Sequence, residues 1–542
     1  MAQTQVDRIL QTVREAQRAY AGYSQEQVDR ILDAMNEASV PLADQWARLA
    51  VEETGFGRVE DKVTKNLFAS RDVYRYIRPM QTVGFIEVDA ASAIYEVAQP
   101  MGIVAAIVPS TNPTSTAIYK TMVSLKARNG VVHSPHPAAR RCIAAVVNTL
   151  HDAAVKAGAP RGIVGVLEEP TIEDTQALMA HRETNVILAT GGMGLVRAAY
   201  ASGKPAYGVG PGNVPAFIER TATVDKAVRD VIAGKSFDWG TICASEQSVI
   251  VDEPVADEAR RLFGDHGGYF ADDKEKALLE AAMVSPDGHV NPKIVGKSPQ
   301  AIASLAGFSV PASTRVLLVK MEGVGRDHPL SMEKLSPVLC WYVEDGWEDG
   351  CKRCIEILRY GGLGHTLSVH TRDLEVVRQF ALHKPAFRII VNSPSTHGAI
   401  GYTTNLPPSM TLGCGALGNN ITSDNITPLH LIDRKRIAME TRPLEGETND
   451  PLPPLVSQKD RVASAAKAFV EDRMSRKDVS ARTGRAVSAV PAAGGDLPVD
   501  FVSEQDVRKA MQEGRKVLIH SGTLLTPLAR ELGEEHQIFE RR

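Results

Sequence analysis

Six cysteines in 542 residues are too few for a disulfide framework, and they favour reduced thiols inside a cell. No apolar run approaches the roughly 18 residues of a membrane helix, and residues 1–20 contain no apolar signal core. Lysine and arginine total 61 against 65 acidic residues, without a long basic block. A nucleic-acid-binding stripe is therefore not expected, and we predict a soluble, cytoplasmic protein with neither nucleic-acid nor membrane partners.

The usual fingerprint of a dinucleotide-binding turn is absent as well. It requires GxGxxG directly after a strand and an acidic residue roughly 20 positions further on. Neither GGMG at 191–194 nor GVGPG at 208–212 meets this requirement. Considered alone, these glycines indicate tight turns more strongly than a cofactor site.

The sequence does contain a repeated strand–helix–strand pattern. Residues 102–108 predict a buried strand, 116–130 a helix and 131–135 a second, parallel strand. Residues 185–218 repeat this pattern around a glycine-rich turn. Further strands are predicted at 248–252, 315–320 and 387–392. We therefore predict an α/β protein with doubly wound sheets.

Other patterns flank these units. Residues 5–55 carry apolar side chains at helical spacing, and residues 84–100 alternate as a hairpin does. An amphipathic helix is predicted at 457–474, followed by an alanine-, glycine- and proline-rich segment at 475–500 that is typical of a flexible linker. Residues 501–542 regain order as helix, strand at 516–520, and helix, a piece too small to bury a good core alone.

One cysteine has unusual surroundings. Cys243 lies in FDWGTICASEQS, where small and polar residues form a predicted loop. A nucleophilic cysteine needs access, thiolate character and donors for the charge that its attack creates on a substrate oxygen. Asn112 follows a strand at the carboxyl edge of the sheet, and its amide is a candidate donor. Spacing alone leaves two alternatives open: Cys243 packs in a core, or Asn112 only shapes an Asn-Pro turn.

Cys351 and Cys354 form a CxxC pair that suggests redox or metal chemistry. The surrounding WEDGCKRCIEILRY predicts a helix with Cys354 on its apolar side, and the chain has no second CxxC. Because a structural zinc site needs about four ligands, we favour packing over zinc and predict no metal.

Seven motifs carry a resemblance to a known family. In order along the chain they are PSTNPTSTAIYK, VVHSPHPAA, ILATGGMGLVRAAYASGKPAYGVGPGNVP, GKSFDWGTICASEQSVIV, EKLSPVL, GGLGHT and PPSMTLGCGALGNN. Over residues 5–440 the chain resembles the aldehyde dehydrogenase superfamily. More narrowly, it is similar to the CoA-acylating branch, including the aldehyde dehydrogenase half of bifunctional aldehyde-alcohol dehydrogenases and the propionaldehyde dehydrogenases of bacterial microcompartments.

The resemblance implies both fold and site. It implies an aldehyde dehydrogenase-like fold with two doubly wound α/β domains, an oligomerisation arm and a C-terminal extension. The expected division is a cofactor-binding domain at 1–236 that includes the arm at 84–100, a catalytic domain with an oligomerisation segment at 237–445, a helix and linker at 446–500, and a tail at 501–542. The implied catalytic residues are Cys243 as nucleophile, Asn112 as oxyanion donor and His365 in proton transfer or an architectural role. The implied cofactor-binding residues are Ser110, Thr111, Pro135, Thr190, Gly191, Gly192, Gly210 and Glu333.

Two positions depart from the hydrolytic aldehyde dehydrogenases. Val209 occupies the place of their general-base glutamate, so no carboxylate is available there to activate water. Ser134 occupies the place of a ribose-binding lysine, which leaves the choice between NAD and NADP open, with NAD preferred. The departures favour acyl transfer to coenzyme A over hydrolysis.

The implied activity is reversible conversion of a short-chain aldehyde, acetaldehyde or propionaldehyde, with coenzyme A and NAD into acyl-CoA and NADH. Three alternatives stay open: another small aldehyde such as sulfoacetaldehyde, a hydrolytic dehydrogenase, and an inactive scaffold that keeps the fold. Family members form dimers or tetramers, so a homo-oligomer is expected. The tail, with LLTPLARELGEE at 524–535, resembles segments that recruit enzymes into microcompartments, which predicts shell proteins as partners and a microcompartment location. A tail that docks on its own enzyme is the alternative.

Overall fold

The computed structural model describes residues 4–89, 93–285, 288–444, 499–502, 504–525 and 527–541. The chain divides into two compact units, Met1–Phe469 and Val470–Arg542, and each is considered by itself. The helix predicted at 457–474 and nearly all of the linker predicted at 475–500 lie outside the described residues.

Helices open the larger unit, as the apolar spacing over residues 5–55 predicts, and two further helices follow that range. They are α1 (Gln5–Tyr20), α2 (Gln25–Ser39), α3 (Ala43–Thr54), α4 (Val59–Leu67) and α5 (Val73–Ile77). The first two begin at capping boxes, in which Thr4 pairs with Asp7 and Ser24 with Gln27. A left-handed glycine, Gly55, ends α3.

A five-stranded parallel sheet follows, in the order β5-β4-β3-β6-β7. Its strands are β3 (Ile103–Val108), β4 (Gly130–Pro135), β5 (Val164–Val166), β6 (Val186–Thr190) and β7 (Ala206–Val209). Its helices are α6 (Pro113–Lys126), α7 (Arg140–Lys156), α8 (Ile172–Ala180) and α9 (Met193–Ala201). One apolar core joins the sheet to α2, α6 and α7, and another joins it to α1, α8 and α9. The sheet is therefore covered on both faces, and both predicted strand–helix–strand units are confirmed.

The second sheet has seven parallel strands in the order β10-β11-β12-β9-β8-β13-β14. They are β8 (Val214–Ile218), β9 (Glu246–Asp252), β10 (Gly268–Ala271), β11 (Val316–Lys320), β12 (Val338–Glu344), β13 (Gly364–His370) and β14 (Ala386–Val391). α10 (Val224–Ser236) and α11 (Ala256–Asp265) pack on one face. The other face meets α12 (Asp273–Met283), α13 (Pro299–Ala306), α14 (Gly346–Tyr360) and α15 (Leu374–His383). A short helix, α16 (Ser395–Ala399), follows β14.

The boundary between the sheets lies earlier than the predicted domain boundary at residue 236. β8 is a strand of the seven-stranded sheet and α10 packs on that sheet, although both precede residue 237. Only four residues separate β7 from β8, and both are short buried strands, so the local pattern gives no sign that the chain changes sheets between them.

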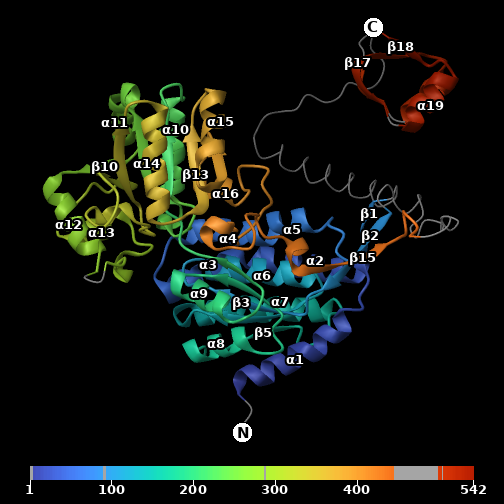
Figure 1. Ribbon diagram of the computed structural model, residues 1–542, viewed down its shortest axis with the longest axis horizontal. Helices are drawn as coiled ribbons and strands as arrows, with labels where there is room; N and C mark the ends of the chain where they lie inside the picture. Colours follow the sequence, from blue (N-terminus) through green and yellow to red (C-terminus); the bar gives the residue numbers. More distant parts are fainter. Residues whose placement is uncertain are drawn as a thin grey trace. The chain divides into compact units, whose positions relative to one another are not determined.

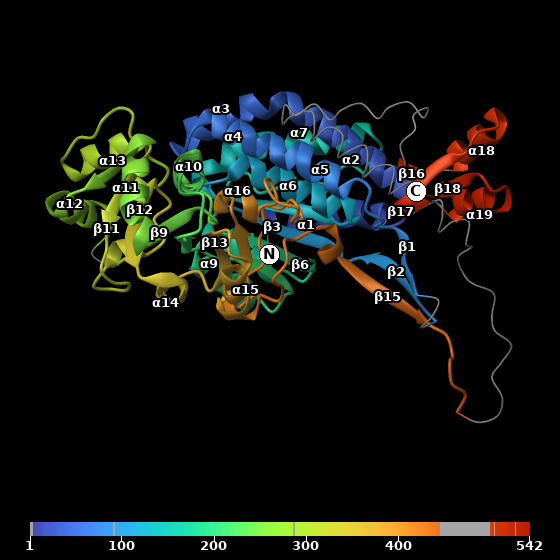
Figure 2. The same ribbon diagram turned by 90° about the horizontal axis from the view of Figure 1, so that it is seen from above.

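The predicted hairpin is confirmed as β1 (Gly84–Asp89) and β2 (Ile94–Pro100), which pair antiparallel. A third strand, β15 (Ile432–Ala438), pairs antiparallel with β2 and was not predicted. The three strands lie side by side in Figure 1 and in the view of Figure 2. The arm thus joins residues more than 300 positions apart in sequence.

The CxxC pair packs as predicted. Cys354 is fully buried and Cys351 nearly so, both on α14 in the core beneath the seven-stranded sheet. Among the described residues, no group of three histidine, cysteine or acidic side chains is placed to hold a metal ion.

The described part of the smaller unit forms a three-stranded parallel sheet with two helices. It consists of β16 (Val499–Val502), α18 (Glu504–Glu513), β17 (Val517–Leu525), α19 (Pro527–Glu535) and β18 (Phe539–Arg541). The predicted helix, strand and helix are present. The unit also has a small apolar core of its own, which includes Val502, Val507 and Ile519. No helix in the described parts of the chain is long and apolar enough to cross a membrane.

Two leucines of the seven-stranded layer test this packing. Leu358 on α14 is fully buried, whereas Leu374 at the start of α15 is 82% exposed. We expect Leu358→Ala to lower the free energy of unfolding by about 2–5 kcal/mol, because it removes buried methyl groups and leaves a cavity. The matched Leu374→Ala should change it by less than about 0.5 kcal/mol. Equal shifts of the two urea-unfolding midpoints would contradict the placement of α14.

Candidate active site

A cavity of about 680 Å³ lies at the carboxyl ends of β3, β4, β6 and β7 and reaches the loop that carries Cys243. This edge of a parallel sheet is where α/β proteins bind ligands. All of the predicted cofactor-binding residues line it: Ser110, Thr111, Pro135, Thr190, Gly191, Gly192, Gly210 and Glu333. Cys243 and Asn112 line it too, whereas His365 does not. Their chemical roles stay predictions.

Cys243 sits on a turn between the short helix Phe237–Gly240 and β9, partly buried at the cavity wall. Burial and the neighbouring carboxylate of Glu333 raise the pKa of its thiol to about 12, while the buried guanidinium of Arg388 acts in the opposite direction. The thiol is therefore accessible but neutral at physiological pH.

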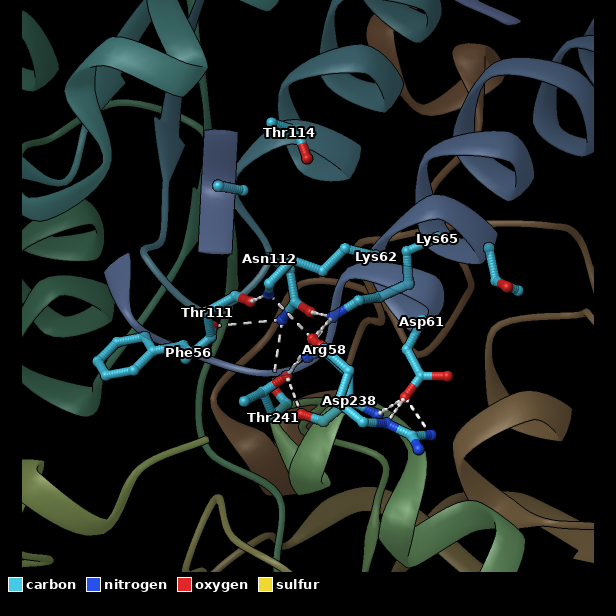
Figure 3. Close-up of polar contacts among 12 residues, drawn as sticks. Phe56, Arg58, Asp61, Lys62, Lys65, Thr111, Asn112, Thr114, Asp238 and Thr241 are labelled. Carbon is cyan, nitrogen blue, oxygen red and sulfur yellow. Dashed lines mark hydrogen bonds and ion pairs between the residues drawn. The ribbon is translucent and has the colours of Figure 1, made fainter. Parts of the chain in front are cut away.

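Asn112 is the N-cap residue of α6, yet its side chain makes no capping hydrogen bond. Its amide points instead to the cysteine loop, where Nδ2 donates to the Thr241 carbonyl oxygen at 3.2 Å (Figure 3). Nδ2 also lies 3.2 Å from Thr111 Oγ1, and Oδ1 accepts from Lys65 Nζ at 2.5 Å. The amide predicted to bind an oxyanion is thus held two residues from the nucleophile's own backbone.

A buried ion cluster surrounds that amide. Asp238, fully buried in the turn before Cys243, accepts from Lys62 and Lys65 of α4. Its carboxylate also accepts from the backbone N–H of Arg58 and from Thr241 Oγ1, both at 2.7 Å (Figure 3). The cluster ties α4 to the start of the cysteine loop.

Glu333 reaches the cavity from the segment before β12. Its Oε1 accepts from the backbone N–H of Gly212 at 3.0 Å, and burial raises its pKa to about 7. Gly212 itself is crowded, because a Cβ there would overlap the Cys243 carbonyl oxygen and approach the His365 ring to 3.1 Å. Only glycine allows these three segments to meet.

His365 lies behind Gly212 and is fully buried. Its Nδ1 is 2.9 Å from Thr366 Oγ1, and its Nε2 has no hydrogen-bond partner among the described residues. Burial lowers its pKa to about 3, so the ring is neutral. The structure therefore places it against the cysteine backbone and outside the open cavity, which favours the architectural alternative over direct proton transfer.

The residues at the turn after β6 suit a dinucleotide pyrophosphate. Gly192 caps α9 without any side-chain bond, and the Leu195 N–H bonds back to the Gly192 carbonyl oxygen, which leaves the N–H groups of Met193 and Gly194 open to an anion. A Cβ at Gly192 would meet nothing within 4 Å, and the Thr190 hydroxyl is buried without a hydrogen-bond partner in the described residues. The chain thus offers an open, polar cradle at this point of the cavity.

Several lining residues escaped the sequence reasoning. α8 contributes Ile172, Thr175, Gln176 and Met179 to the wall. Thr175 Oγ1 lies 2.8 Å from Ser134 Oγ, the residue that replaces the usual lysine. Lys65 and Asp238 were missed as well. Their partners lie more than 100 positions away in sequence or on another element, so no local pattern marks them.

Comparisons with known proteins agree with this geometry. Residues 1–266 match the model of the aldehyde dehydrogenase family. An aldehyde-alcohol dehydrogenase of Clostridium acetobutylicum is 43% identical over 439 residues, which cover 80% of this chain and 51% of the relative. The chain thus spans about half the length of the curated relatives it matches first.

Two solved structures are similar to the larger unit. An acetylating aldehyde dehydrogenase from Geobacillus thermoglucosidasius is 47% identical with a TM-score of 0.80, covering 82% of this chain and 98% of the other. A propionaldehyde dehydrogenase from the fucose utilisation microcompartment of Clostridium phytofermentans is 26% identical with a TM-score of 0.73, covering 80% and 97%.

The raised thiol pKa predicts how Cys243 reacts with iodoacetamide. Below the pKa the thiolate fraction grows tenfold per pH unit, so the alkylation rate should climb roughly tenfold per unit from pH 7 to 10. The rate is measured by mass spectrometry of the peptide that contains Cys243. The urea-unfolded chain is the control, because its thiol should level off near an ordinary pKa of about 8.5. A native rate that levels off by pH 9 would contradict the prediction.

Proposed function

The chain belongs to the aldehyde dehydrogenase family and to its acylating branch, and we propose that it reversibly converts a short-chain aldehyde, coenzyme A and NAD into acyl-CoA and NADH. The proposal depends on the composition of the cavity wall. The wall contains the Cys243 thiol and the Asn112 amide, and at position 209 it has a valine rather than a carboxylate. Val209 is 3% exposed and lines the cavity. A water molecule beside position 209 therefore finds no carboxylate there to accept its proton.

The protein's own groups perform the following steps. The Cys243 thiol first loses its proton to solvent water, and the small thiolate fraction present at neutral pH adds to the aldehyde carbon. The resulting alkoxide accepts hydrogen bonds from Asn112 Nδ2 and the Cys243 backbone N–H. A nicotinamide cofactor bound in the cavity supplies the acceptor for the hydride that leaves as the alkoxide collapses. The acyl group stays on Cys243 as a thioester. The coenzyme A thiol then loses its proton and its sulfur bonds to the acyl carbon. The bond from that carbon to Cys243 breaks, and Cys243 leaves as a thiolate that takes up a proton.

Hydrolysis of the acyl-enzyme is the alternative reaction, and the side chain that could support it is Glu333. Glu333 is the only carboxylate in the described lining, and its pKa of about 7 is suitable for a general base. One of its oxygens already accepts from the Gly212 backbone N–H, which supports a fixed, ribose-holding role. Dependence of turnover on coenzyme A separates the two reactions.

The charge of the lining supports the choice of cofactor and substrate. Among the described residues it contains neither lysine nor arginine, and burial lowers the pKa of His136. A ribose 2′-phosphate and a sulfonate would both lack a counter-charge, so NAD and an uncharged aliphatic aldehyde are favoured over NADP and sulfoacetaldehyde.

The remaining proposals concern organisation. We assign cofactor binding to the five-stranded sheet, catalysis to the seven-stranded sheet, and self-association to the arm of β1, β2 and β15. Similarity of the tail to recruiting segments supports delivery of the enzyme to a microcompartment shell. A microcompartment enzyme among the structural relatives supports the same location.

The activity is tested by NADH formation from acetaldehyde and from propionaldehyde, each with and without coenzyme A. We expect sustained turnover only with coenzyme A, because the acyl group otherwise stays on Cys243. Cys243→Ala should abolish turnover, since it removes the nucleophile. Equal turnover without coenzyme A would mean that Glu333 or another group activates water, and the acylating assignment would be wrong.

Targeting is tested by deleting residues 475–542. We expect the deleted enzyme to keep its turnover, because every lining residue belongs to the larger unit. It should no longer co-sediment with shell particles, whereas the full chain should. Unchanged co-sedimentation would overturn the targeting proposal.

A further inference from the structure

We propose that Lys65, held by Asp238, is a positioning residue that fixes and polarises the oxyanion-binding amide of Asn112. This inference rests on the acylating function proposed above. It assigns a task to a buried ion cluster that neither binds the cofactor nor carries the acyl group.

The orientation of the amide follows from the chemistry of its neighbour. An ammonium group only donates hydrogen bonds, so Lys65 Nζ selects the amide oxygen, at 2.5 Å, over the amide nitrogen. The nitrogen must then face Thr241 in the cysteine loop, where Nδ2 finds the carbonyl oxygen. The opposite flip would set an ammonium against an NH₂ group and leave donors unpaired on both sides.

The charge of Lys65 also strengthens the amide as a donor. Positive charge at Oδ1 draws electron density away from Nδ2, which makes its N–H groups better donors to an oxyanion in a site of low dielectric. The lysine is 2% exposed, so bulk water screens this effect little.

Asp238 holds Lys65 in place, and its own position is fixed by several bonds. The backbone N–H of Asp238 donates to Asp61 at 2.7 Å, and its carboxylate takes the Arg58 N–H at the same distance. Asp238 and Trp239 both adopt left-handed φ angles, 48° and 52°, although neither is glycine. Strained residues of this kind persist only where the surroundings over-determine them, and they cluster at functional sites.

Lys62 is a natural control within the same cluster. It is 2% exposed, lies one helical turn before Lys65 on α4, and also contacts Asp238, at 3.0 Å. Its second bond goes to the backbone oxygen of Thr111 rather than to the Asn112 side chain. Loss of either ammonium should affect folding similarly, but only Lys65 acts on the amide.

The proposal is tested by the NADH burst in a single turnover without coenzyme A, which reports thiol attack and hydride loss alone. We expect Lys65→Met to slow the burst at least about tenfold, part of the roughly 10²–10³-fold cost of losing an oxyanion donor. In the Asn112→Ala background it should add almost nothing, because no amide is left to orient. Lys62→Met should cost the same factor in both backgrounds.

The pH dependence is a second readout that a merely structural role would not move. Burial and the charge of Lys62 lower the pKa of Lys65 to about 8, against the raising effects of Asp238 and Asp61. The ammonium is present below that pH and lost above it. The wild-type burst rate should climb with the Cys243 thiolate fraction and level off above about pH 8, where the Lys65 charge is lost. Lys65→Arg, which stays charged, should keep climbing through that range, and it carries the test if Lys65→Met does not fold.

The possible failures are distinguishable. Absence of any wild-type burst with either aldehyde would remove the proposed function. Where the wild-type burst is normal, any of three results overturns this inference alone. Lys65→Met could match the wild type, its effect could be undiminished beside Asn112→Ala, or the Lys65→Arg rate could level off near pH 8 as the wild-type rate does. Iodoacetamide labelling of Cys243 should proceed at the wild-type rate in folded Lys65→Met, because alkylation needs no oxyanion donor.

Discussion

The Asp238 carboxylate is the point at which the two halves of the active site are joined. Residue 238 immediately precedes the cysteine loop, whereas its cationic partners come from α4, in the helical layer beside the five-stranded sheet. Burying these charges costs several kcal/mol per ion in real proteins. The pairing offsets that cost only while all partners keep their places, so any shift of Cys243 relative to the Asn112 amide is destabilising.

A steric constraint complements this electrostatic one. At Gly212 three chain segments approach within the space that one methyl group would fill: the loop that carries Cys243, the β7–β8 connection, and the start of β13 at His365. The Glu333 carboxylate closes the arrangement by accepting the Gly212 N–H. The glycine-rich motif GVGPG therefore serves two purposes. Gly210 opens toward the cavity, and Gly212 lets the nucleophile's backbone rest against its support.

Sequence reasoning located the groups that local pattern determines. Asn112 follows the buried strand β3, so local pattern was enough to place it at the sheet edge. For Cys243 the pattern indicated only an accessible loop before a strand, and its role as nucleophile came from the family resemblance. The same reasoning failed where partners are remote. β15 pairs with β2 across more than 300 residues, Lys65 meets Asp238 across 173, and β8 leaves one sheet for another after four residues. For His365 the motif left proton transfer and an architectural role open, and choosing between them depends on packing against the Cys243 backbone that no motif records.

The lack of a free base in the site explains why an acyl group would pass to a thiol rather than to water. A thiol with a pKa of about 8.5 reaches its nucleophilic form near neutral pH with little help, whereas bulk water, at about 15.7, requires a strong base or a metal ion. In the described lining the one candidate base, Glu333, is already engaged by a backbone N–H, and Val209 presents only methyl groups where a second base would stand. Without a base in the site, the acceptor of the acyl group must ionise by itself, so the more acidic thiol is favoured over water. The same choice conserves the thioester, because exchange of one thiol for another changes little in bond energy and leaves the reaction free to run in either direction.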